Sequence, residues 1–197
     1  MVASLTPTTP MDLATALRIQ ARANHLANRR LQAAVGLLPS AEFAAQRIGF
    51  FPSIAQTLNH LLAVDLYYIG ALHGDADQHA RYHAFLAAGS IAALSDRQSA
   101  SDRRLIDWCD GLDAAGCDRL VEMQRSDHVQ LDQACHVLAH LFMHQTHHRG
   151  QVHCMLSGTA VKPPQLDEFL MPSDARFRSD DMAQIGWNEA AVYGRLP

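Results

Sequence analysis

Hydrophobic residues recur three or four positions apart over most of the chain, the spacing that places them on one face of an α-helix. This pattern predicts an all-α protein. We expect the first helix to be capped by Thr9, to have Pro10 at its first position and to end before Gly36. Further helices are expected at residues 52–73, 82–94, 101–112 and 131–156.

Two stretches depart from the helical pattern. Residues 120–131 alternate weakly between polar and apolar positions, which is typical of a small β-hairpin ahead of the last helix. After that helix, Pro163-Pro164 marks a break. We therefore expect one domain over residues 1–157. Residues 158–197 are expected to pack on it as an extension. Its residues 165–197 are expected to be largely irregular apart from a short helix near Asn188–Tyr193.

The last predicted helix carries histidines within its apolar face. On a helical wheel, His144 and His148 lie in the middle of the apolar stripe, and His140 lies at its edge. Residues four apart are neighbours on one face, with Cβ atoms about 5–6 Å apart. Both imidazoles can therefore reach one metal ion, which makes this pair a candidate metal site.

The histidine pair supplies only two ligands. The zinc-protease pattern is absent, because Gln145 stands where that motif has Glu. A third ligand must come from elsewhere, and the best candidate is His60 on the second helix. The periodicity leaves that choice open, because Asp65 lies in the main apolar stripe while His60 lies on a second, also mostly apolar side. Alternatively, the histidines form a buried polar layer that hydrogen-bonds to backbone or water.

Two motifs of the sequence together resemble those of a known family. Phe50-Phe51-Pro52-Ser53-Ile54 leads into Leu58-Asn59-His60-Leu61-Leu62-Ala63-Val64-Asp65, and the block His144-Gln-Thr-His147-His148-Arg149-Gly150-Gln151 follows later in the chain. From about residue 11 to about residue 157, this combination resembles the DinB/YfiT-like family of proposed metalloenzymes. That family is unrelated to the DNA polymerase that shares the name.

The resemblance implies a four-helix bundle with long loops, commonly a homodimer. It also implies that His60, His144 and His148 bind a divalent metal ion. Zn²⁺ and Ni²⁺ are the expected ions, because both suit nitrogen ligands. Relatives with assigned activities transfer a low-molecular-weight thiol such as mycothiol or bacillithiol to a substrate, or use the thiol to isomerise one.

Three further residues are candidates for a supporting role. Asp65 needs a partner in its apolar stripe, and we favour a buried pair with Asn28 or Arg29 over a role in orienting a metal ligand or accepting a proton. Arg149 is expected to bind a carboxylate, although it could also hold an anionic substrate. His140 is the other group that could act beside the metal.

Composition excludes several classes of protein. The chain has 197 residues, 48% of them hydrophobic, which is enough for one well-buried domain. Its net charge of −4 and its dispersed basic residues argue against nucleic-acid binding. Four cysteines without a CxxC pair fit reduced thiols. Since neither a signal peptide nor a membrane-spanning run is apparent, we expect a cytoplasmic protein without membrane contact.

Three imidazole ligands would leave a coordination position open, as in catalytic metal sites. The leading hypothesis is therefore a metal-dependent enzyme that activates a nucleophile for a small-molecule substrate, and the family resemblance implies a thiol for S-transfer as that nucleophile. A metal-dependent hydrolase and a non-catalytic, metal-binding dimeric bundle are the alternatives.

Overall fold

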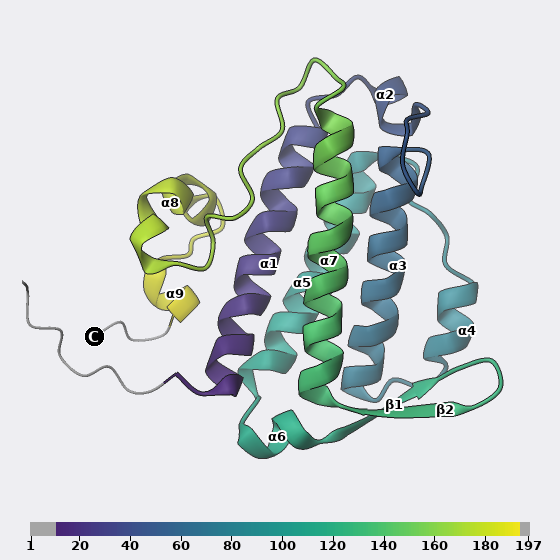
Figure 1. Ribbon diagram of the computed structural model, residues 1–197, viewed down its shortest axis with the longest axis vertical. Coiled ribbons are helices and arrows are strands. Elements are labelled where there is room, and N and C mark those ends of the chain that lie inside the picture. The colour runs from purple at the N-terminus through teal and green to yellow at the C-terminus, as the bar shows by residue number, and fades with distance from the viewer. Residues whose placement is uncertain (1–10, 194–197) are drawn as a thin grey trace, which may run out of the picture.

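The computed structural model describes residues 11–193 and contains a bundle of four long helices (Figure 1). These are α1 (Leu13–Val35), α3 (Ile54–His73), α5 (Ile91–Asp110) and α7 (Ala134–Leu156). Helices α1 and α7 run in one direction and α3 and α5 in the other, and α1 and α3 each pack against both α5 and α7. The predicted mostly helical fold is confirmed. None of the described helices combines the length and hydropathy that a membrane-spanning segment requires.

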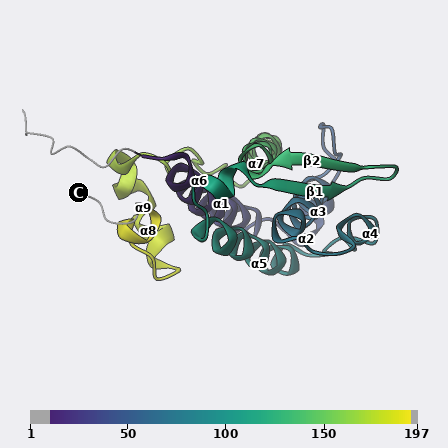
Figure 2. The same cartoon turned by 90° about the horizontal axis from the view of Figure 1, so that it is seen from below.

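Short elements connect the long helices. They are α2 (Ser40–Ala44), α4 (Gln78–His83), α6 (Ala114–Asp118) and the strands β1 (Leu120–Gln124) and β2 (Val129–Gln133). Because α3 and α5 run in the same direction, the chain between them returns along the side of the bundle after α4 (Figure 1). The strands form the predicted hairpin, with an antiparallel register from Leu120 opposite Gln133 to Gln124 opposite Val129. Figure 2 shows the hairpin extending from α7 past α3 toward α4.

Several helix boundaries differ from the prediction. Helix α1 begins at Leu13, because Asp12 accepts a hydrogen bond from the Thr15 backbone N–H at 2.7 Å; the expected cap Thr9 lies outside the described residues. The two helices expected at 82–94 and 101–112 are instead the short α4 and the continuous α5, which Ser90 caps through the Ala93 N–H. Helix α7 starts later than expected because residues 129–133 pair in β2.

The C-terminal extension is more regular than expected. It contains a 3₁₀ turn (Pro172–Asp174), the unpredicted α8 (Ala175–Ala183) and the predicted short helix α9 (Glu189–Tyr193). The fully buried Arg178 holds these pieces together, since its guanidinium binds Glu189 at 2.6 Å and donates to the Glu168 and Met171 carbonyl oxygens. Side chains of the extension pack against α1; these are Phe169, Met182 and Val192 on Ile19, Ala23, Leu26 and Ala27.

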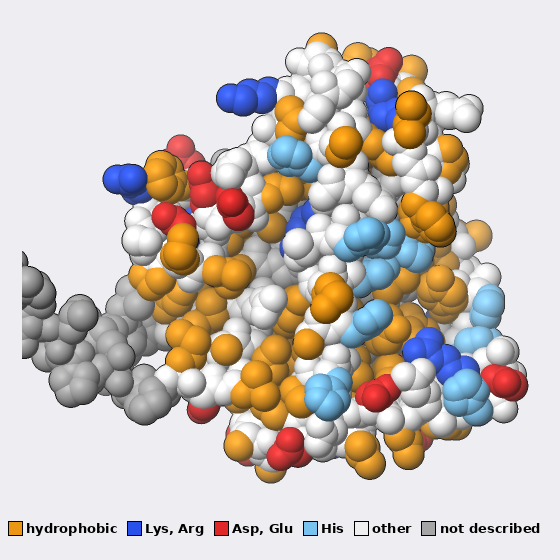
Figure 3. Space-filling model, in the orientation of Figure 1, with side chains coloured by type: hydrophobic (Ala, Val, Ile, Leu, Met, Phe, Trp, Pro, Cys, Tyr) orange, Lys and Arg blue, Asp and Glu red, His pale blue; other side chains and the backbone are white. Residues whose placement is uncertain are grey.

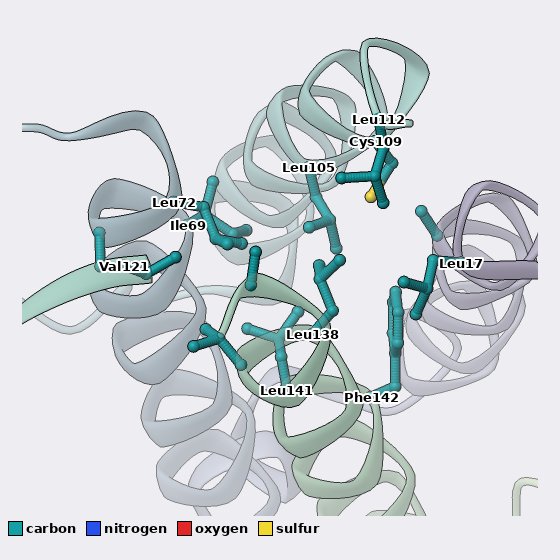
Figure 4. Close-up of a cluster of buried hydrophobic side chains, with 14 of the residues drawn as sticks. Leu17, Ile69, Leu72, Leu105, Cys109, Leu112, Val121, Leu138, Leu141 and Phe142 are labelled. Carbon is teal, nitrogen blue, oxygen red and sulfur yellow. The ribbon is translucent and has the colours of Figure 1, made fainter. Parts of the chain in front are cut away.

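Two apolar clusters fill the bundle. The cluster near the hairpin includes Leu17, Leu105 and Leu138 and is drawn in Figure 4. The cluster near the other end includes Leu31 and Leu156. Between them, each long helix contributes buried polar side chains: Asn24 and Asn28 from α1, Asp65 from α3, Gln98 and Asp102 from α5, and Gln145 and Arg149 from α7. The middle of the bundle is therefore a polar layer between two apolar ones.

Candidate metal centre

Three histidines converge where α3 and α7 pack side by side. Because these helices are antiparallel neighbours, His60 of α3 lies beside His144 and His148, one turn apart on α7. One ring nitrogen from each residue lies within 4.8 Å of the other two. The Nε2 atoms of His60 and His144 are 3.1 Å apart. Figure 3 shows histidine side chains gathered on the face formed by α3 and α7.

This arrangement fits a divalent metal ion. Two nitrogens bound tetrahedrally at about 2.0–2.1 Å from zinc lie roughly 3.3 Å apart, close to the distance between the two Nε2 atoms. A hydrogen bond between those rings would also bring them close, but it would not require a third imidazole at the same point. In the described part of the chain, no Asp, Glu or Cys ligand atom joins the group. The cluster could hold a metal ion with nitrogen ligands alone.

Two residues that sequence reasoning did not assign support these rings. The His148 Nδ1–H donates to Gln151 Oε1 at 2.8 Å, which leaves Nε2 as the nitrogen that can bind a metal. Gln151 stands three residues after His148, a spacing that could have indicated this contact. The Phe51 ring packs on His60, at 4.5 Å between centroids, and lies 5.7 Å from His148. No periodic signal indicated that Phe51 covers the site.

The environment keeps the three imidazoles neutral. Burial lowers the pKa of His144 to about 3, and the neighbouring His148 and His60 rings add to this effect. Burial and the nearby His148 also lower the pKa of His60 from its ordinary 6.5. Burial lowers the pKa of His148 despite the hydrogen bond to Gln151. At neutral pH the rings therefore carry lone pairs rather than the protons that would compete with a metal.

Asp65 lies in the polar layer and does not have the predicted partner. Its Oδ2 accepts hydrogen bonds from Gln98 Nε2, at 2.6 Å, and from Gln145 Nε2. The expected pairing with Asn28 or Arg29 is wrong, since Asn28 donates instead to Asp102 of α5. Complete burial and the nearby Asp102 raise the pKa of Asp65 to about 7. Among the described residues, no hydrogen bond joins Asp65 to any of the three histidines.

Arg149 belongs to the same polar layer. Its Nη1 donates to the side-chain oxygens of Asn24, Asn28 and Gln145, so these three partners are amides, and none is the predicted carboxylate. Burial lowers the pKa of Arg149 to about 10, an effect that the charges of Asp102 and Asp65 oppose. The guanidinium thus compensates two buried carboxyl groups inside the bundle.

His140 is exposed and lies beside a cavity next to the histidine cluster. Its ring centroid is 6.3 Å from that of His144 and 5.1 Å from that of Tyr68. The cavity has a volume of about 490 Å³ and lies between α3, α4, α7 and the tip of the hairpin. Its lining includes His140, His144, Tyr67, Tyr68 and Arg125. A small molecule in this cavity could contact His144.

Comparison with known proteins agrees with this geometry. The model of the DinB family matches residues 19–181, which include α3, α7 and all three histidines. No curated protein matches the sequence. Since the match spans most of the chain and the structure is a mostly helical bundle with a three-histidine cluster, the chain belongs to the DinB family.

Proposed function

We propose that the protein is a metal-dependent enzyme that uses His60, His144 and His148 to hold Zn²⁺ or Ni²⁺ and activates a thiol for S-transfer to a small electrophilic substrate. The observation that carries this proposal is the convergence of three neutral imidazoles, without a carboxylate, beside an open cavity. Three nitrogen ligands leave a position for an exogenous group, as in catalytic rather than structural sites.

Each part of the site has a task in this proposal. A bound divalent ion would supply Lewis acidity that lowers the pKa of an approaching thiol. Gln151 fixes the orientation of His148, and Phe51 shields the rings of His60 and His148 from water. In the cavity, the guanidinium of Arg125 lies over the Tyr67 ring, where it can attract an anionic group of the thiol or of the substrate.

The surroundings favour a thiol over water as the nucleophile. A hydrolase of this type needs a general base within hydrogen-bond reach of the attacking water. Asp65 is engaged with Gln98 and Gln145 inside the bundle, which leaves His140 as the candidate base. A thiol, with an ordinary pKa of about 8.5, is already far more acidic than water, so near a metal it can release its proton to the solvent without such a base. The hydrolase is therefore the second candidate, supported by the position of His140 near His144.

A non-catalytic metal-binding dimer is the remaining alternative. It would require a closed site with a fourth protein ligand. The open cavity beside His144 supports the hypothesis of a catalytic site instead. Homodimer formation stays a prediction.

Cobalt substitution tests the thiol proposal. The protein is loaded with Co²⁺ and titrated with N-acetylcysteine as the probe thiol, and the near-ultraviolet absorption of a cobalt–thiolate pair is followed. We expect this band in the wild type and its loss in His148→Ala, together with thiol consumption when an activated aryl chloride is added. Absence of the band, combined with metal-dependent hydrolysis of an activated ester that His140→Ala abolishes, would replace the thiol proposal with the hydrolase.

A further inference from the structure

A second pair of histidines lies outside the three-histidine cluster. His79 and His83 stand four residues apart on one face of α4. Their Nε2 atoms are 3.0 Å apart, and their ring centroids are 4.4 Å apart. Both residues line the cavity that also contains His144. The two ring nitrogens therefore face one point on the wall of this cavity.

The surroundings of His79 and His83 allow a cation to bind at this point. His79 is half-buried and His83 is exposed, so water and ions can reach the pair. Arg81, which lies between them in sequence, pairs with Asp75 at 3.5 Å. The Nε2 atoms of His79 and His83 contact each other and, within residues 11–193, hydrogen-bond to no other group. Two imidazoles that present lone pairs to one point across a helical turn can chelate a transition-metal ion.

We propose that His79 and His83 form a second site for a divalent transition-metal ion, with water filling the remaining positions. This site does not rest on the proposed function, because it shares no ligand with the three-histidine cluster. With two protein ligands instead of three, it binds its ion more weakly and exchanges it more readily. It is a regulatory position beside the cavity rather than a second catalytic centre.

Binding of the ion at this site would stabilise α4. This helix has only six residues, and its N-cap Asp77 has φ 60° and makes no side-chain capping hydrogen bond. Isolated helices of this length are marginal in water. An ion that joins His79 to His83 clamps one turn of α4 and stabilises it through binding to the folded form. Because the Tyr82 ring of α4 packs edge-to-face against the Tyr67 ring of α3, ordering of α4 also fixes the aromatic wall of the cavity.

Calorimetric titration with Ni²⁺ alone tests this site in the full-length protein without a His tag. The wild type should show two binding events of different affinity. His79→Ala and His83→Ala should each lose the weaker event and keep the tighter one. His136→Ala, which removes an exposed histidine of α7, is the matched control and should keep both. Persistence of the weaker event in both α4 variants, or its absence from the wild type, would overturn the proposal.

Hydrogen exchange gives a second readout that locates the effect. Ni²⁺ added beyond the first equivalent should slow amide exchange in residues 78–84 of the wild type but not of His83→Ala. Equal exchange with and without this excess would contradict the proposal. Failure of the three-histidine site would be recognised separately, since the tighter event would then be missing while the weaker one remained.

Discussion

The Asp65→Asn variant should become more stable relative to the wild type as the pH rises. Asp65 is completely buried, and the charge of Asp102 adds to the effect of burial in raising its pKa. Its Oδ2 accepts from Gln98 and Gln145, and the Oδ1 of an asparagine can accept from the same two donors. The substitution therefore keeps the hydrogen bonds of the polar layer while removing a group that ionises.

The pKa of Asp65 sets the size of the effect. It is raised from the ordinary 3.8 to about 7, a difference that corresponds to about 4 kcal/mol. Between these two pH values the native state retains a proton that the unfolded state releases. The free energy of unfolding of the wild type therefore loses this contribution as the pH rises from about 4 to about 7. Asparagine cannot titrate, so the variant lacks that loss.

Urea denaturation at several pH values between about 4 and about 8 measures this effect. The difference in unfolding free energy, variant minus wild type, should rise by about 4 kcal/mol across this range, because the other titrating groups cancel. Asp127→Asn, at the exposed tip of the hairpin, is the control and should show no such rise. A difference that does not change with pH would refute a raised pKa for Asp65 and would mean that the buried carboxylate is already ionised in mild acid.

Three other perturbations have defined outcomes. Gln151→Leu removes the acceptor for the His148 Nδ1–H and should weaken metal affinity about 10–100-fold in competition with a chelator; unchanged affinity would exclude this supporting role. Metal affinity should vary little between about pH 8 and about pH 6, because the pKa of His144 is about 3 and those of His60 and His148 are lowered; a steep loss in this range would contradict neutral rings. Phe169→Ala should cost about 3–5 kcal/mol in docking of the C-terminal extension on α1, seen as faster proteolysis after residue 158 with the metal retained; unchanged proteolysis would show that the extension docks without this ring.

Features that depend on a single helix could be predicted from the sequence. The wheel placed His144 and His148 on one face of α7 because the helical repeat alone determines that relation. It left His60 undecided, since both of the faces in question are buried in α3. What brings His60 to the other two is the antiparallel packing of α3 against α7, which is a property of the whole bundle. The family resemblance, rather than periodicity, pointed to that residue.

Features that depend on side-chain contacts between different helices could not be predicted in this way. The partners of Asp65 come from α5 and α7, helices whose position relative to α3 no local pattern specifies. Helix α8 was missed because its charged sequence lacks an apolar stripe, and it is held instead by the pairing of Arg178 with Glu189 and by contacts with α1. Local propensity says little about a segment that tertiary contacts stabilise.

Metal content tests the central claim most directly. Protein purified without a His tag, freed of weakly bound ions by desalting, is analysed by elemental mass spectrometry as wild type, His60→Ala, His148→Ala and the control His136→Ala. We predict about one Zn or Ni ion per chain in the wild type and in the control, and loss of the ion in the other two variants while circular dichroism shows that they remain helical. A wild type that binds no metal even after reconstitution, or variants that retain it in full, would contradict the three-histidine metal centre.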